Sequence, residues 1–94
     1  MTTQSESSAT NPAPEVTVKL RRDRFIQVCA ERGLRTNAAI AKTIRMSERQ
    51  VDRVITDGDD PSGRFIGRTL AAWPLLSFRA LFAVIDETTG EEMR

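Results

Sequence analysis

Residues 37–56, NAAIAKTIRMSERQVDRVIT, decide the fold because they hold two short helical patterns with almost nothing between them. The first pattern follows Thr36, whose hydroxyl can cap the amino end of a helix. The second follows Ser47, and Gln50 three residues later completes the spacing of a capping box. Apolar residues recur three and four positions apart in both patterns, at Ile40, Ala41, Ile44, Val51, Val54 and Ile55. The sequence therefore predicts helices over 37–45 and 47–56 with a tight corner between them.

The residues around this corner favour close packing of one helix on the other. Ala41 is small enough to let the second helix approach, and Met46 can fill the space at the corner. Val51, with Val54 or Ile55, would then anchor the second helix to the rest of the domain. Two short helices packed in this way are typical of a helix-turn-helix, which places its second helix in the major groove of DNA.

Further helical patterns flank this unit on both sides. Gly33 is a typical left-handed residue at the end of the preceding helix, and Pro74 ends the one that follows. Ser77 can cap a final short helix. The flanking helices are predicted over 23–32, 64–73 and 78–82. The fold class predicted from these patterns is all-α with five helices.

The two ends of this helical region have a weaker signal for strands. Residues 15–20 alternate apolar and polar side chains, which is the pattern of a short strand. Residues 83–85 are short and β-branched, so they are ambiguous, but they can pair with 16–18 in a small two-stranded sheet near 16–20 and 82–86. The folded domain is predicted over 15–86. Residues 1–14 are predicted to be disordered and 87–94 to form a frayed acidic tail.

The composition excludes several classes of site. The chain has 94 residues with no His, no Tyr and a single Cys, so Cys–His metal sites and Ser–His or Cys–His catalytic pairs are excluded. Cys29 lies in an apolar pattern and is interpreted as a small buried residue. No apolar run approaches the ~20 residues that span a bilayer, and no signal peptide is visible. We expect a cytoplasmic protein that is not an enzyme and needs no metal or cofactor.

The net charge of +1 conceals a strong asymmetry along the chain. Residues 1–15 carry −2 and residues 86–94 carry −3. The middle holds 13 of the 14 Lys and Arg residues against 7 of the 13 acids, which gives +6. A basic folded unit between acidic ends is consistent with a nucleic-acid partner.

With its flanking helices, the 37–56 pattern resembles the lambda-repressor-like and Cro-like (Xre-type) helix-turn-helix proteins, particularly small phage or actinobacterial members. The resemblance covers roughly residues 20–85. It depends on Ala41, on Ile44 before the corner, on Met46 within it, and on Val51 with Val54 or Ile55. One departure is Arg45, because the family usually has Gly at the corner and a left-handed Arg costs about 1 kcal/mol.

The resemblance implies that residues 47–56 enter the major groove of double-stranded DNA. Arg49 and Arg53 can each hold guanine, Glu48 can accept from cytosine, and Asp52 can do the same or orient an arginine. The full set of implied DNA-binding residues is Asn37, Ser47, Glu48, Arg49, Gln50, Asp52, Arg53, Thr56 and Arg64. Asn37, Thr56 and Arg64 belong to this set as phosphate contacts at helix ends and loops. The implied function is a transcriptional regulator of the phage or bacterial repressor type.

Two alternatives remain open from the sequence. The interleaved charges of residues 48–53 are also typical of a solvated helix face with ion pairs three and four residues apart. The same fold can also serve an antitoxin or another protein-binding module, with a partner held through residues 75–85. Because one module covers only a half-site, we expect a homodimer on a pseudo-palindromic operator, for which 75–85 is the candidate interface.

Overall fold

The computed structural model describes residues 15–93, in which five helices and three strands follow one another along the chain. The predicted disorder of residues 1–14 lies outside the described residues. The elements are β1 (Val16–Leu20), α2 (Arg22–Glu31), α3 (Asn37–Ile44), α4 (Glu48–Ile55), α5 (Gly63–Ala72), α6 (Phe78–Leu81), β2 (Phe82–Asp86) and β3 (Glu92–Met93). Within this part of the chain, every helix is too short or too polar to cross a lipid bilayer.

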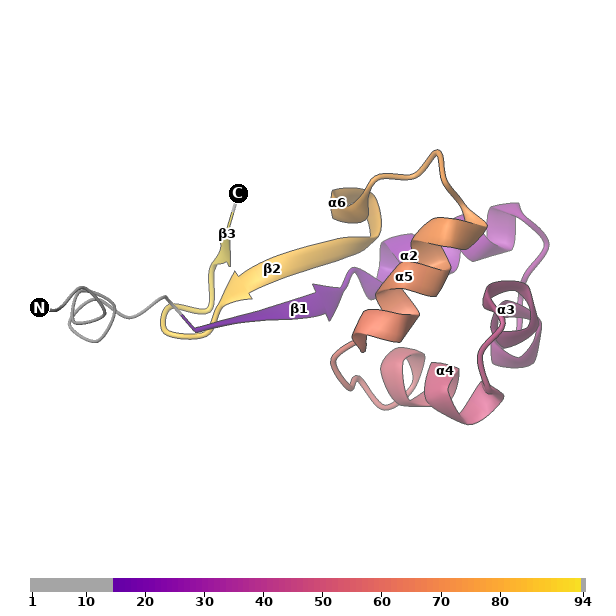
Figure 1. Ribbon diagram of the computed structural model, residues 1–94, viewed down its shortest axis with the longest axis horizontal. Helices are drawn as coiled ribbons and strands as arrows, with labels where there is room; N and C mark the ends of the chain where they lie inside the picture. The colour runs from indigo at the N-terminus through magenta and orange to yellow at the C-terminus, as the bar shows by residue number, and fades with distance from the viewer. Residues whose placement is uncertain (1–14, 94) are drawn as a thin grey trace, which may run out of the picture.

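The helices gather into one body, and the sheet projects from that body as an arm (Figure 1). We call β1, β2 and β3 together the sheet arm. Its order is β1-β2-β3, and both pairings are antiparallel. Val16 pairs with Asp86 and Leu20 with Phe82, so the two ends of the folded region meet along the arm. This confirms the predicted pairing of residues near 16–20 and 82–86.

Aromatic rings form the centre of the helical body. Phe25, Phe65 and Phe82 come from α2, α5 and β2, and all three are fully buried. The Phe65 ring lies 5.7 Å from that of Phe25 and 6.3 Å from that of Phe82, so Phe65 joins the two ends of the core. Trp73 packs edge-on against Phe25 at 6.0 Å and lies partly buried at the margin of the core. Burial of these rings is the main source of stability in a domain of this size.

The caps predicted around the α3–α4 corner are confirmed. The Thr36 hydroxyl accepts a hydrogen bond from the amide of Ala39 at 3.1 Å. Ser47 and Gln50 form the complete capping box: the Ser47 hydroxyl accepts from the Gln50 amide at 3.2 Å, and the Gln50 side chain accepts from the Ser47 amide at 3.3 Å. The second helix therefore starts at a fixed point directly after the corner.

Arg45 turns the chain between α3 and α4 in the left-handed conformation, with φ 61° and ψ 50°. Among residues 15–93 it is the only residue other than glycine with a positive φ. The Met46 amide closes the turn with a 2.9 Å bond to the carbonyl of Ala41. The corner thus keeps its left-handed geometry although a side chain is present, and the cost of about 1 kcal/mol is offset by the packing around it.

Replacing Arg45 by glycine should raise the free energy of unfolding by roughly 0.5–1 kcal/mol, because glycine adopts a positive φ without strain. Urea unfolding followed by circular dichroism measures the change. Gly33 offers the opposite change as a control, because it also has a positive φ (77°) and the space around it is open. Gly33→Ala should lower the stability by a similar amount. Equal stability of Arg45→Gly and the wild type would show that the corner is not strained.

The structure has the five predicted helices, and it adds a third strand, β3, to the predicted two-stranded sheet. It corrects the frayed tail predicted over 87–94, since the chain turns at Gly90 and returns as β3 beside β2. The Arg21 guanidinium binds both carboxylate oxygens of Glu92, and Arg79 donates to the Met93 carbonyl at 2.9 Å. These bonds between distant segments of the chain hold residues 87–93 in place, although their composition is polar and rich in turn formers.

Candidate nucleic-acid interface

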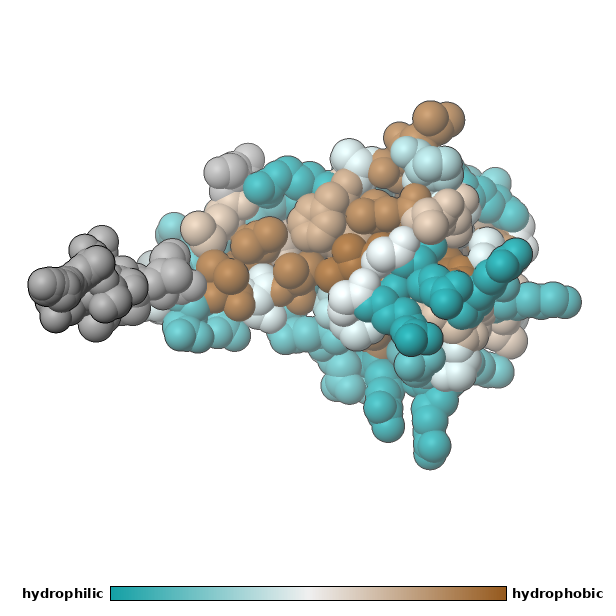
Figure 2. All heavy atoms as spheres, viewed as in Figure 1, coloured by the Kyte–Doolittle hydropathy of each residue, from teal (hydrophilic) through white to brown (hydrophobic). Residues whose placement is uncertain are grey.

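The helix α4 has one buried side and one exposed side. Val51, Val54 and Ile55 are buried, with exposures of 0%, 7% and 3%. The exposed side carries most of the predicted DNA-binding residues, namely Ser47, Glu48, Arg49, Gln50 and Arg53. In Figure 1 this helix lies along the lower surface of the body, and Figure 2 shows hydrophilic side chains projecting there. The sequence therefore placed these five residues together correctly.

The charges on α4 form two rows of like sign. Glu48 and Asp52 are four residues apart, as are Arg49 and Arg53, so neighbours along each row repel each other. Of the ion pairs found within residues 15–93, none involves these four side chains. Arg49 and Asp52, three residues apart, have opposite charges, but they form no ion pair within residues 15–93. The arrangement leaves two exposed arginines, Arg49 and Arg53, available to an external anion.

Asn37 connects the start of α3 with the far half of α4. Its side-chain nitrogen donates to Asp52 at 2.7 Å and to the Thr56 hydroxyl at 3.1 Å. Asp52 is half-buried in this contact, and its suggested role as a base contact or arginine partner stays a prediction. The hydrogen bonds of Asn37 with Asp52 and Thr56 hold α4 against α3. The backbone amides before Ala39, in the first turn of α3, are the groups at this end of the helix that can bind an anion.

Replacing Asn37 by alanine should lower the free energy of unfolding by about 1–2 kcal/mol, because the half-buried Asp52 carboxylate loses its hydrogen-bond donor. Urea unfolding gives this change. Ala38→Ser is a suitable control, since residue 38 is exposed on the same turn and makes none of these contacts. An unchanged unfolding midpoint in Asn37→Ala would show that the contact does not fix the helix.

Two further residues support α4, and the sequence reasoning did not find them. The Arg22 guanidinium donates at 2.7 Å to the carbonyl of Ile55, which satisfies an otherwise free acceptor at the end of α4. No local signal could reveal a contact between residues 33 positions apart. Arg45 is exposed beside the start of α4 and shares a surface depression with Arg68 of α5. Its spacing of four residues from Arg49 was visible in the sequence.

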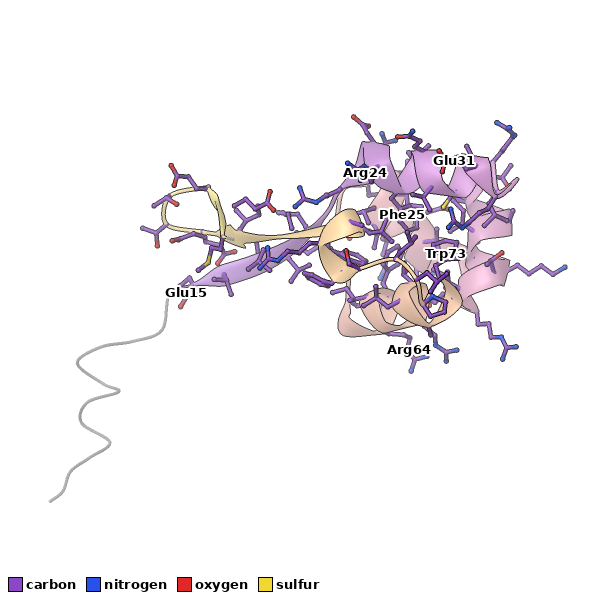
Figure 3. The ribbon with its side chains drawn as sticks, turned by 90° about the horizontal axis from the view of Figure 1, so that it is seen from above. Glu15, Arg24, Phe25, Glu31, Arg64 and Trp73 are labelled. Carbon is purple, nitrogen blue, oxygen red and sulfur yellow. The ribbon has the colours of Figure 1, made fainter. Side chains whose placement is uncertain are left out.

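Arg64 stands apart from α4, at the start of α5. Ser62 caps this helix by accepting from the Phe65 amide at 3.0 Å, so α5 begins at Gly63. Arg64 is exposed and projects outward from the body (Figure 3). The predicted phosphate contact is thus accessible, and the structure places it on a different helix from the arginines of α4.

Cys29 and the acidic side chains are other reactive groups in the part of the chain that the structure describes. Burial raises the pKa of the Cys29 thiol to about 11, so this group is a neutral, packed side chain near pH 7. In the part of the chain that the structure describes, no three Cys, Asp or Glu side chains gather at a distance suited to a metal ion. The exposed face of α4 is therefore the best candidate site.

Comparison of the chain with protein-family models, with curated proteins and with solved structures finds no match. The function of the α4 face must therefore be judged from its geometry and its charge.

Proposed function

We propose that the protein is a sequence-specific DNA-binding regulator in which α3 and α4 act as a helix-turn-helix and α4 enters the major groove. The observation that carries the proposal is the row of exposed, unpaired arginines on a helix whose position is fixed at both ends. The capping box fixes its start, while Asn37 and Arg22 fix its far half. A recognition element needs this combination, because free side chains must meet base edges from a rigid support.

The roles within this proposal follow from exposure and hydrogen bonding. Arg49 and Arg53 are exposed and make the base contacts, each in a bidentate manner with guanine. Glu48 is exposed beside them and accepts from a cytosine amino group. Arg64 and the first amides of α3 bind phosphates and set the register of the protein on the duplex. Ser47 and Gln50 start the helix and lie at the margin of the contact.

Selection of bound sites from random duplex DNA tests the proposal. A short sequence should be enriched, and it should bind roughly 10³-fold or more tightly than a scrambled duplex of the same length. The affinity should also fall steeply as salt increases, because phosphate contacts release counterions. Absence of enrichment after several rounds, with equal affinity for selected and scrambled duplexes, would exclude specific recognition.

A second candidate function is a protein-binding module of the antitoxin or accessory type. The observation in its favour is Leu75, which is 97% exposed at the centre of the loop between α5 and α6. A large apolar side chain held in solvent is a typical anchor for a partner. A stable complex with a second protein that is lost in Leu75→Ser, together with no measurable DNA binding, would favour this function.

A further inference from the structure

The two faces of the sheet arm differ sharply in character. Residues directly opposite each other in an antiparallel sheet lie on the same face, so the register assigns each side chain. One face carries Val16, Val18, Leu20, Phe82, Val84 and Met93, with Asp86 at its outer end. We call this the apolar arm face. The opposite face, which we call the polar face of the arm, carries Thr17, Lys19 and Glu92 together with Ala83 and Ile85.

The polar face of the arm already has its contacts within the chain. Lys19 forms an ion pair with Asp60 at 2.5 Å, and Thr17 donates to the same carboxylate at 2.8 Å. The bond from Lys19 lowers the pKa of Asp60 below its ordinary value. Arg21 binds Glu92 at the edge of the arm. Asp60, in the loop between α4 and α5, therefore contacts this face at β1.

The apolar arm face is exposed to solvent along its outer half. Val16 is 48% exposed and Met93 36%, and Val18 and Val84 between them are only half-buried. Near the body, the Phe78 ring of α6 stacks on Phe82 at 5.3 Å and continues the apolar surface. Figure 2 shows an apolar band running along the arm towards the body on this side. A sheet projecting from its domain with such a face normally packs against another surface.

We infer that a second copy of this chain packs on the apolar arm face, with the two arms antiparallel across a two-fold axis. Figures 1 and 2 share one view, in which the apolar band of the arm faces the viewer. Rotation about the vertical direction of that view brings two apolar arm faces together and points the second arm the opposite way. It also keeps both α4 helices on the lower side, where one DNA duplex can meet them. This last point rests on the proposed function.

Charge complementarity also favours a second copy. The tip of the arm carries four acids that form no ion pair within residues 15–93, at Glu15, Asp86, Glu87 and Glu91. Residues 61–85, which include α5 and α6, carry three arginines and no acid. With the arms antiparallel, the acidic tip of one copy approaches the α5–α6 side of the other. Opposite charges thus meet at both ends of the interface.

The size of the face indicates how tight this dimer is. A five-residue strand is about 17 Å long and neighbouring strands are about 4.8 Å apart, so the arm alone offers roughly 200 Å² per copy. The extension over α6 enlarges this area, but it stays at the low end of specific interfaces, which bury about 800 Å² per partner. We therefore expect a weak dimer that forms in the high micromolar range and is strengthened by two half-sites on DNA.

Sedimentation equilibrium of the full chain without DNA, from about 10 to 500 μM, tests the inference separately from DNA binding. The wild type should show a concentration-dependent dimer, and Val16→Lys with Met93→Lys should weaken it at least tenfold. Ile26→Lys is the matched control, because Ile26 is 37% exposed on α2, away from the arm, and should leave the dimer unchanged. Circular dichroism and the urea midpoint check that each variant folds.

A wild type that stays monomeric to 500 μM overturns the inference, and so does a double variant that dimerises as well as the wild type. If deletion of residues 1–14 converts a monomer into a dimer, those residues cover the face in the full chain and the inference also fails. Should the double variant misfold, Glu87→Arg gives a second test at the arm tip and should weaken the dimer severalfold. Dimerisation without any DNA binding would support this surface while refuting the proposed function.

Discussion

Replacing Arg49 and Arg53 together by alanine is expected to abolish sequence-specific DNA binding while leaving the fold intact. Each bidentate contact with a base contributes about 1–3 kcal/mol of discrimination, so the two together account for roughly 30-fold to more than 10⁴-fold in affinity. Both side chains are exposed and make no ion pair within the described residues, so their removal costs little stability. Fluorescence anisotropy with selected and scrambled duplexes measures both the affinity and the specificity ratio.

The informative result is a collapse of the specificity ratio towards one, because residual phosphate contacts still allow non-specific binding. Arg24→Ala serves as the control for loss of an exposed arginine, since Arg24 is exposed on α2, on the side of the body opposite to Arg64 (Figure 3). It should weaken binding to both duplexes only slightly and equally. If the double variant keeps the wild-type preference for its selected site, α4 does not read the bases.

Replacing Phe65 by alanine is expected to cause the largest loss of stability of any single change considered, about 3–5 kcal/mol. Phe65 is fully buried and its ring joins those of Phe25 and Phe82, so truncation leaves a cavity between α2, α5 and β2. A domain of this size has a total stability near 5–15 kcal/mol, and the loss is thus a large share of it. Urea unfolding at 25 °C, followed by circular dichroism, gives the difference.

Leu75→Ala is the control for this experiment. Because Leu75 is 97% exposed, its truncation removes almost no buried apolar area. Its midpoint should match that of the wild type. If Phe65→Ala were to cost less than about 1.5 kcal/mol, the aromatic cluster would not be the centre of the core. Binding measurements on Phe65→Ala need temperatures at which the variant remains folded.

The local features of the fold could be predicted from the sequence because they depend on neighbouring residues. Thr36, Ser47 and Ser77 cap their helices as predicted, since a cap needs only a hydroxyl and an amide two or three residues later. The end of the α2 region at Gly33 follows from its left-handed conformation. The α3–α4 corner was also located correctly, although its left-handed arginine was expected to be costly.

The features that the sequence could not predict depend on contacts between distant segments. β3 has two residues and no apolar alternation, and it is held by pairing with β2 and by contacts from Arg21, which follows β1, and Arg79 of α6. In the sequence Asp52 looks like an ordinary surface acid. Its hydrogen bond with Asn37 depends on the angle between α3 and α4, which the sequence does not show. Phe82 was assigned to the last helix, whereas pairing with Leu20 makes it the first residue of β2.

The pairing of β1 with β2 has a consequence for the order in which the molecule forms. Val16 and Asp86 are paired although the sequence between them contains every helix, so closing the arm requires a loop of about seventy residues. Contacts of such long range are slow to form, whereas the α3–α4 unit contains only local contacts. We therefore expect the α3–α4 unit to form early in folding and the long-range pairing of the arm to form late.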